Sequence, residues 1–376
     1  MITITENSFY SFTTEALIVT LCLVTIGFFF GHKLEKTSFY KPYIVSRRLM
    51  GTVTLLYLTM NLWLKLFDYR DTNPITASAL NIACYYAGAI LCYYALTVLL
   101  NPNLFHNRKS IRNDIIRYAG FIVWLFIAVV FISTKWAYIM LIAAAVYFTI
   151  DVVRVTVLFF REYHKAVRNI NEFYSDFIEG YVQWMYNGVV LIIISGLIGG
   201  ISIFTSKWGI GVYSLLGVGV FFYVLMCYTN YLMHIREVSA AIETETDNET
   251  DSSIAETGND LPTTLTNNAA IAKNIQEWID RKGFLQAGIT IVELSNQLKT
   301  NRTYSSAYIN NVYNCSFRDF ICQLRIGYSK QLLSDTNLSM TEIAEQTGFS
   351  SVSSFSRAFA QHEKCSPTTW RNRHLN

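Results

Sequence analysis

Long apolar runs alternate with short polar segments over the first 235 residues of the chain. A helix needs roughly 20 apolar residues to cross the core of a bilayer, and seven of these runs are long enough. The pattern therefore predicts an all-α fold that begins with a seven-helix transmembrane bundle. The predicted spans cover residues 14–31, 49–66, 76–100, 117–134, 136–158, 185–205 and 208–232.

Composition supports this interpretation and divides the chain. Of the 376 residues, 52% are hydrophobic and only 15% are charged, and the mean hydropathy is +0.28. Soluble domains carry about 25% charged residues, and here the charges are concentrated after residue 235. We expect a seven-span membrane domain over residues 1–235, an acidic disordered tether over 236–269 and a soluble domain over 270–376.

Lysines and arginines gather in every second loop between the predicted spans. Such residues stay on the cytoplasmic side, so the distribution predicts an N-terminus outside and a C-terminal domain in the cytoplasm. We therefore expect a multi-pass protein of the inner (cytoplasmic) membrane. The other loops carry only Lys65 and Arg70, then Lys135, then Lys207. The positive residues after spans one, three and five are Lys33, Lys36, Lys41, Arg47 and Arg48, then Arg108, Lys109 and Arg112, then Arg161, Lys165 and Arg168.

The first span does not resemble a cleavable signal peptide. Its N-terminal flank contains Glu6 and Glu15 and no Lys or Arg, whereas a signal peptide begins with a positively charged region. We therefore expect it to stay in the mature protein as a membrane helix.

Asp151 and Arg154 fall inside the fifth predicted span, one turn apart near its cytoplasmic end. Intramembrane charges are functional candidates, but Arg154 can also pair with Asp151 and extend toward the interface, and we favour this structural pair. Apolar residues then recur every three or four positions from Arg161 to Tyr181. This predicts an amphipathic helix that lies at the interface or continues the fifth span.

Two further patterns in the spans allow two interpretations each. Cys84-Tyr85-Tyr86 repeats as Cys92-Tyr93-Tyr94, so these tyrosines either line a pocket or form hydrogen bonds between helices, which we favour. Gly196 and Gly200 form a small-xxx-small pair, which serves packing inside one bundle, the favoured interpretation, or a dimer contact.

The predicted tether is acidic throughout. Residues 237–270 contain eight Asp or Glu and no Lys, Arg or aromatic residue. Segments of this composition cannot bury enough apolar surface to fold, and like charges extend them. The tether should therefore give the C-terminal domain reach without binding DNA or anionic lipid.

The clearest local pattern is that of a helix-turn-helix between Ser339 and Arg371. Ser339 and Glu342 form a capping box at the start of a short helix, and Gly348 is placed to end that helix in a left-handed conformation. A second helix, from Ser350 or Ser351, carries Phe355 and Phe359 on one face. Two short helices about a glycine turn are typical of this motif.

The same pattern occurs earlier in the domain. Thr290 and Glu293 repeat the capping box at an offset of 49 residues, and Ile309 matches Phe359 at an offset of 50. Between the two units, apolar residues from Phe317 to Leu332 predict one long helix. The domain thus contains two helix-turn-helix units joined by a helix.

At these residues the chain resembles the AraC/XylS-type transcription regulators. The resemblance rests on E-I-A-E-Q-T-G-F-S-S, F-S-R-A-F and S-P-T-T-W-R, and covers about the last hundred residues. It implies two reading helices in successive major-groove faces of promoter DNA, and a homo-oligomer, because the family often works as dimers. RNA polymerase is a further candidate partner.

The first unit departs from the second at two places. Ser305 stands where the second unit has Phe355, and Ala307 stands where it has Arg357. Arg357 is the preferred base reader, because a guanidinium binds guanine O6 and N7 together, and Arg371 is expected to hold phosphate. The residues expected to bind DNA are Arg302, Thr303, Ser306, Asn310, Ser350, Ser351, Ser353, Ser356, Arg357 and Arg371.

Charge and the lack of catalytic motifs complete the prediction. From residue 271 onward there are twelve Lys or Arg and eight Asp or Glu, a balance of +4 that suits DNA. We find no catalytic, cofactor or metal motif in the sequence. The sequence predicts a membrane-tethered, sequence-specific DNA-binding transcription regulator, not an enzyme, with the bundle as anchor and sensor. The alternative is a membrane signalling or scaffold protein whose helix-turn-helix domain binds protein.

Overall fold

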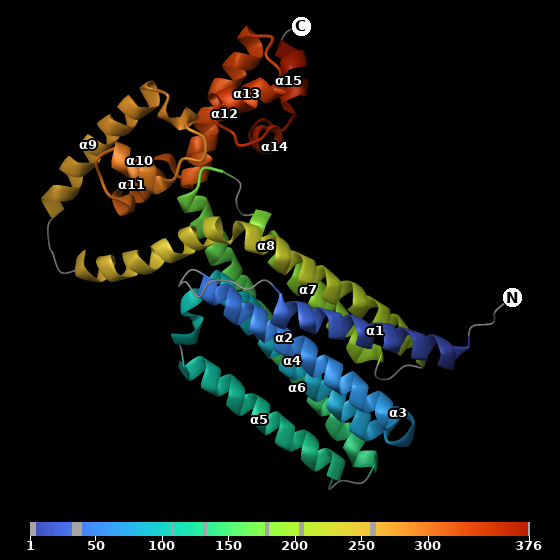
Figure 1. The fold of residues 1–376 in the computed structure, drawn as a ribbon. Coiled ribbons are helices and arrows are strands. Elements are labelled where there is room, and N and C mark those ends of the chain that lie inside the picture. Colours follow the sequence, from blue (N-terminus) through green and yellow to red (C-terminus); the bar gives the residue numbers. More distant parts are fainter. Residues whose placement is uncertain are drawn as a thin grey trace. The chain divides into compact units, whose positions relative to one another are not determined.

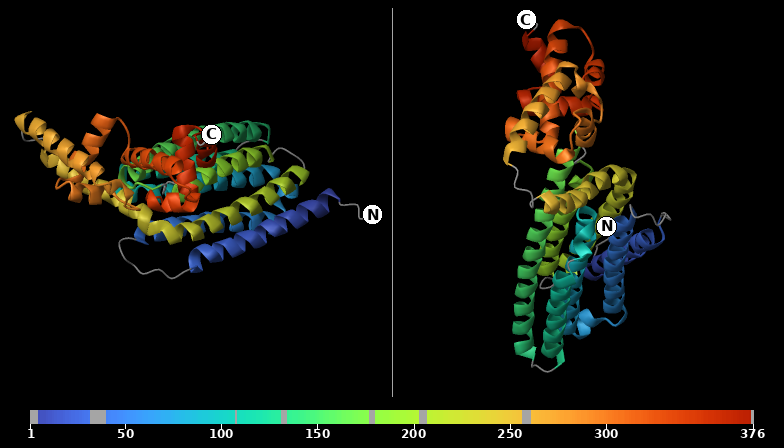
Figure 2. Two further views of the ribbon diagram at one scale, coloured as in Figure 1. Left: turned by 90° about the horizontal axis from the view of Figure 1, so that it is seen from above. Right: turned by 90° about the vertical axis from the view of Figure 1, so that its left-hand side faces the viewer.

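The chain forms two compact units (Figures 1 and 2). The first, here called the bundle, consists of residues 1–165 and 182–236; the second, here called the C-terminal unit, consists of residues 166–181 and 237–376. Among the described residues helices predominate, and one isolated β-bridge joins Tyr174 to Thr290. The computed structural model describes residues 5–374, except 32–39, 107, 131–133, 177–179, 203–206 and 256–260.

Seven helices in the described part of the chain are long and apolar enough to cross a membrane. Their number agrees with the seven predicted spans, but most helices begin earlier or end later than the apolar runs, since polar turns continue the helix beyond the apolar segment. Short helices α3 (Tyr69–Thr72) and η2 (Pro102–His106) flank the third. The seven are α1 (Glu6–Phe30), α2 (Lys41–Leu66), α4 (Pro74–Leu100), α5 (Arg108–Val130), α6 (Thr134–Phe173), α7 (Gly180–Ser202) and α8 (Lys207–Ala255).

Within the bundle, α2 packs against both α1 and α4, and α4 also packs against α5. Buried polar groups are hydrogen-bonded between helices of the bundle. Thr25 on α1 donates to Thr54 on α2 over 2.8 Å, and the hydroxyl of Tyr43 donates to the backbone carbonyl of Tyr228 over 3.0 Å. Such bonds satisfy polar groups that neither lipid nor apolar side chains can satisfy.

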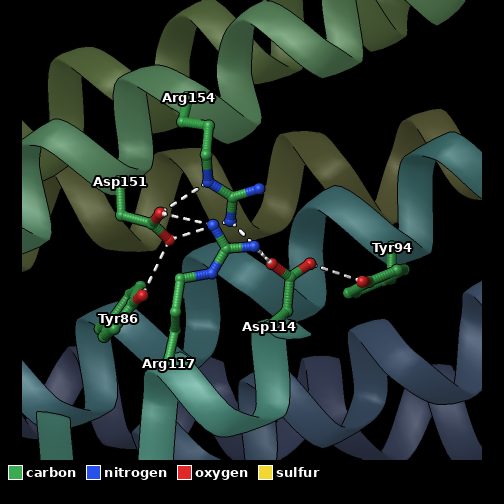
Figure 3. A network of polar contacts seen from close by, with 6 residues as sticks. All are labelled: Tyr86, Tyr94, Asp114, Arg117, Asp151 and Arg154. Atoms are coloured by element: carbon green, nitrogen blue, oxygen red, sulfur yellow. Dashed lines mark hydrogen bonds and ion pairs between the residues drawn. The ribbon is translucent and has the colours of Figure 1, made fainter. Parts of the chain in front are cut away.

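A network of charged residues joins α4, α5 and α6 (Figure 3). Asp151 lies 2.6 Å from Arg154, which confirms the predicted pair, and Arg154 also reaches Asp114 on α5 over 2.8 Å. Arg117 lies 2.5 Å from Asp114 and 3.9 Å from Asp151. Two carboxylates and two guanidinium groups cancel in charge, which makes a buried cluster tolerable in an apolar surrounding.

Each of the two interpretations of the tyrosine repeat on α4 holds for two of its four tyrosines. Tyr86 donates to Asp151 over 2.8 Å and Tyr94 donates to Asp114 over 2.6 Å, so these two tyrosines complete the network (Figure 3). Their neighbours Tyr85 and Tyr93 line a cavity. Successive helical residues face about 100° apart, which sends the two pairs to different surroundings.

That cavity has a volume of about 640 Å³ and is lined by residues of α1, α2, α4, α6, α7 and α8. Its walls are mostly apolar, and no Asp, Glu, Lys or Arg is among the described residues that form them. Polar groups are supplied by Asn61, Thr149, Thr156, Ser195 and tyrosines, including Tyr57, Tyr85 and Tyr213. The rings of Tyr85 and Tyr213 are 6.0 Å apart and those of Tyr57 and Tyr85 are 5.9 Å apart.

Helix covers most of the segment for which a disordered tether was expected. Helix α8 continues to Ala255, and α9 (Leu261–Asp280) begins six positions later. Glu and Ala favour helix, so an acidic segment can be helical without a packed core. The expectation of irregular structure is therefore corrected for 236–255 and 261–269, while the domain boundaries stay predictions.

The C-terminal unit is built around one long helix, α12. Two groups of short helices flank it, one on each side in the sequence, and the core of the second group includes Ile326, Ile343, Phe355 and Phe359. The elements after α9 are η3 (Gly283–Leu285), α10 (Ile291–Gln297), α11 (Arg302–Tyr308), η4 (Ile309–Tyr313), α12 (Phe317–Asp335), α13 (Met340–Gln346), α14 (Val352–Glu363) and α15 (Pro367–His374).

Candidate nucleic-acid interface

The second helix-turn-helix unit consists of α13, a glycine turn and α14. Both halves of the predicted capping box are present: the Glu342 amide donates to Ser339 Oγ over 3.2 Å, and the Ser339 amide donates to the Glu342 carboxylate over 2.7 Å. Gly348 has φ +79°, and a side chain there would meet the carbonyl oxygen of Leu285. A glycine is therefore required at this turn.

Helix α14 is fixed by its apolar face. Phe355 and Phe359 are completely buried, their ring centroids are 5.7 Å apart, and Phe349 packs on Phe355 at 5.5 Å. With these rings inside, Ser353 and Arg357 are on the exposed side of the helix. The unit thus presents the expected reader Arg357 on a helix held by three aromatic side chains.

The other serines of this unit that were expected to bind DNA lie at the start of α14 or along it. Ser351 is the N-cap of α14 and accepts from the Ser354 amide over 3.1 Å, with Ser350 and Ser351 both near the Ser354 hydroxyl. Ser356 is half-buried. A hydroxyl that caps a helix is still at the helix N-terminus, where phosphate groups bind.

Arg371, on α15, has a role inside the domain. Its Nη2 donates to the Leu338 carbonyl over 2.8 Å and its Nε donates to the Leu333 carbonyl over 3.3 Å. The guanidinium thereby ties α15 to the loop after α12. Its phosphate contact stays a prediction, and the structure adds this fold-stabilising role.

The reading helix of the first unit covers the residues expected for it, about Thr303 to Tyr313, but changes in kind along its length. Helix α11 is α-helical from Arg302 to Tyr308, and the chain continues as a π-helix, η4, from Ile309 to Tyr313. Ser305 is completely buried at the position of Phe355, where it accepts a 2.9 Å hydrogen bond from Ser295. A serine fills less volume than a phenylalanine, so the helix has fewer apolar contacts to hold its second turn.

The end of α6 contacts this first unit, a feature that the sequence did not predict. Ser306 Oγ donates to the Glu172 carboxylate over 3.4 Å, and Asn310 donates to Ser306 over 3.5 Å. The Arg302 guanidinium lies 5.4 Å from the centre of the Phe173 ring. Three of the four residues expected to read DNA in the first unit are therefore gathered around the end of α6, while Thr303 is exposed.

The same segment supplies the counter-charge for a buried arginine. Arg325 on α12 has no exposed surface, and it donates to the carbonyls of Phe284 and Gln286 over 2.9 and 2.8 Å. Asp176 accepts from Arg325 over 3.2 Å. Burial lowers the pKa of Arg325 from its ordinary value, and the charge of Asp176 opposes that shift. The amphipathic pattern from Arg161 onward gave the only sequence signal that this region packs against protein.

Comparisons with known proteins agree with this geometry. Residues 294–373 match the family described as "Helix-turn-helix domain". The chain is 27% identical over 114 residues to the melibiose operon regulatory protein of Escherichia coli strain K12, which covers 29% of this chain and 38% of that protein. It is 30% identical over 88 residues to the uncharacterized HTH-type transcriptional regulator YdiP of the same strain, covering 23% and 29%.

A solved structure is also similar in this region. The C-terminal domain of AraT, a response regulator from Geobacillus stearothermophilus, is 26% identical and covers 28% of this chain and 87% of that chain, with a TM-score of 0.27. The chain spans about a third of the length of the curated relatives it matches. Its C-terminal part is a helix-turn-helix domain of the AraC/XylS type, and the relatives are transcription regulators.

Proposed function

We propose that the chain is a membrane-tethered, sequence-specific DNA-binding transcription regulator of the cytoplasmic membrane. The observation that carries the proposal is that one chain contains seven helices of bilayer length and, after them, an AraC/XylS-type domain with two helix-turn-helix units. The positive loops favour a cytoplasmic C-terminus, which is where chromosomal DNA is accessible.

In this proposal α14 is the main reading helix. Arg357 takes the edge of a guanine in the major groove, and Ser353 and Ser356 contact base edges or phosphates. Helix α11 reads the adjacent groove face with Thr303, Ser306 and Asn310, and Arg302 stands before it. Promoter DNA is the partner, the active form is a homo-oligomer, and RNA polymerase is the partner that a bound activator would contact.

The bundle serves as anchor and sensor. Its cavity of about 640 Å³ falls within the range of small-molecule sites. The uncharged walls and the tyrosine hydroxyls suit a neutral, mostly apolar molecule with one hydrogen-bonding oxygen. Ligand binding there would alter the packing of α4 and α6, which also meet in the charged network.

Chromatin occupancy tests the proposal. The intact, membrane-fractionated chain should give motif-bearing peaks that vanish in Arg357→Ala. Arg373→Ala is the matched control, because Arg373 is an exposed arginine of the same domain on α15, and its peaks should persist. Peaks that are unchanged in Arg357→Ala would remove the base reader and leave the function intact. A complete lack of peaks from expressed, folded protein would contradict the proposal.

A second candidate is a signalling or scaffold protein whose C-terminal domain binds protein. It is favoured by the first unit, where Ser306 on α11 already contacts a carboxylate of the same chain, that of Glu172. The salt dependence of DNA binding separates the two. Displacement of counterions from phosphates makes affinity fall steeply with salt, and a flat dependence would favour the protein-binding alternative.

A further inference from the structure

The end of α6 is an integral part of the C-terminal unit. Ala166, Ile170 and Phe173 are 2%, 0% and 7% exposed. After the helix ends, the Ser175 amide donates to the Ile289 carbonyl over 3.2 Å, and Tyr174 forms a β-bridge with Thr290. The bridge is at the N-cap of α10, so the segment is attached at the entry to the first helix-turn-helix unit.

Charged contacts strengthen this attachment at two places on α12. Arg318 Nη1 donates to Asn171 over 2.9 Å, and Arg325 Nη1 donates to Asp176 over 3.2 Å. Arg325 has no exposed surface, so removal of Asp176 would leave a buried cation without its carboxylate. Detachment of the segment is therefore unfavourable unless other interactions offset the loss.

Glu172 brings a carboxylate to the donors expected to meet DNA. It accepts from Ser306, and the Asn310 side chain and the backbone amide of Phe317 also contribute hydrogen bonds to it. A carboxylate, like a phosphate or a base-edge oxygen, is an acceptor for such groups. The same donors cannot serve both, and the negative charge of Glu172 repels a nearby DNA backbone.

We propose that residues 166–176 act as a built-in competitor of DNA at the first helix-turn-helix unit. In the docked state α11 is occupied by Glu172 and Phe173, and the chain binds DNA through α14 alone. Full binding by both units requires that Glu172 leave α11. This inference rests on the proposed function, since it concerns the regulation of the same interface.

The helix that carries the competitor begins in the bundle. Helix α6 is continuous from Thr134 to Phe173 and includes both Asp151 and Arg154 of the charged network. Arg154 and Glu172 are 18 positions apart in this one helix. A change in the packing of the network would thus be passed along α6 to its end. The bundle then controls DNA binding through residues 166–176, and the acidic segment 236–269 only connects the two units along the chain.

The first experiment measures DNA affinity of the full chain in lipid nanodiscs. The probe is a 40-base-pair duplex selected from a randomised pool by the wild-type chain. Glu172→Gln should bind this duplex about 5- to 10-fold more tightly, the range of a modest allosteric coupling, with a steeper salt dependence because the first unit adds phosphate contacts. Glu277→Gln makes the same charge change on α9, where Glu277 pairs with Arg281, and should change affinity less than about twofold.

Equal affinities of Glu172→Gln and Glu277→Gln would overturn the competitor while leaving the proposed function standing. If neither wild type nor Glu172→Gln enriches any sequence from the pool, the proposed function fails and the competitor with it.

A second measurement needs no variant. Hydrogen exchange of the wild-type chain should show that added duplex protects residues 302–313 and, at the same time, exposes residues 166–176. Protection of both segments together would mean that DNA and the α6 end bind side by side, and would overturn the inference.

Discussion

The two helix-turn-helix units share a capping box and a short first helix, and they differ in what holds the reading helix. In the second unit, completely buried Phe355 and Phe359 hold the 12-residue α14. In the first, buried Ser305 and Ile309 stand at the matching positions, and the seven-residue α11 continues into the five-residue π-helix η4. The two aromatic rings hold the second reading helix from within its own unit. The smaller core of the first unit is supplemented by a neighbour, the end of α6, which contacts α11 at Ser306 and Arg302.

The largest expected effect comes from the matched core positions. Phe355→Ala should destabilise the second unit by about 3–5 kcal/mol, because it removes a buried ring and leaves a cavity. Ser305→Ala should cost only about 1 kcal/mol, the worth of one hydrogen bond. Thermal unfolding followed by tryptophan fluorescence can measure both, since Trp370 lies 6.1 Å from Phe359 in the second unit and Trp278 donates a hydrogen bond to Gln297 on α10 of the first. Equal losses of stability in the two variants would show that the two cores do not differ in the way described.

The next effect concerns the dependence of the first unit on its neighbour. Asp176→Asn leaves Arg325 buried without a carboxylate and should destabilise the C-terminal unit by about 2 kcal/mol, less than a fully buried pair because Asp176 is partly exposed. Hydrogen exchange should rise in α10 and α11 and change less in α13 and α14. An equal rise of hydrogen exchange in both units would show that the first unit does not depend on its neighbour more than the second.

The two units should also differ in DNA binding, with a larger contribution from the second unit than from the first. Arg357→Ala should weaken binding of a selected duplex by about 1–3 kcal/mol and relax the preference at one base position. Arg302→Ala should have a smaller effect in the wild-type chain, because the guanidinium lies against Phe173. Titrations of the full chain in nanodiscs measure both variants. A larger loss for Arg302→Ala would make α11 the dominant reader.

The smallest effect is a pH dependence of the second unit. Hydrogen bonds from Ser339 lower the pKa of Glu342 below its ordinary value of 4.5. A carboxyl with a lowered pKa stabilises the folded state above about pH 4.5, and this contribution is lost as pH falls through the folded-state pKa. The Glu342→Gln variant should therefore lose less thermal stability than the wild type as the pH falls from about 5 to about 3. An unchanged slope would show that the capping box contributes little.

Local features of the C-terminal unit were predictable from the sequence. The capping boxes at Ser339 and Thr290 and the left-handed Gly348 all occur where the sequence places them. Each depends on residues within four positions of one another, so neighbouring side chains decide it. The change from α-helix to π-helix at Ile309 was not predicted.

Features that depend on distant partners required the tertiary structure. The sequence showed Asp151 with Arg154, but Asp114 and Arg117 were not recognised as members of the same network, since they come from another helix. Likewise nothing local marks Glu172 as the partner of Ser306, 134 positions away.

Sequence periodicity and capping chemistry determined the seven apolar helices, the two helix-turn-helix units and their outward residues. Helix formation and burial depend on spacing along one chain segment, and spacing is written in the sequence. The structure alone decided which charges meet. Asp176 reaches Arg325 across 149 positions, and such a contact depends on how whole helices pack. That packing, within the C-terminal unit, places residues 166–176 on the reading helix of the first helix-turn-helix unit.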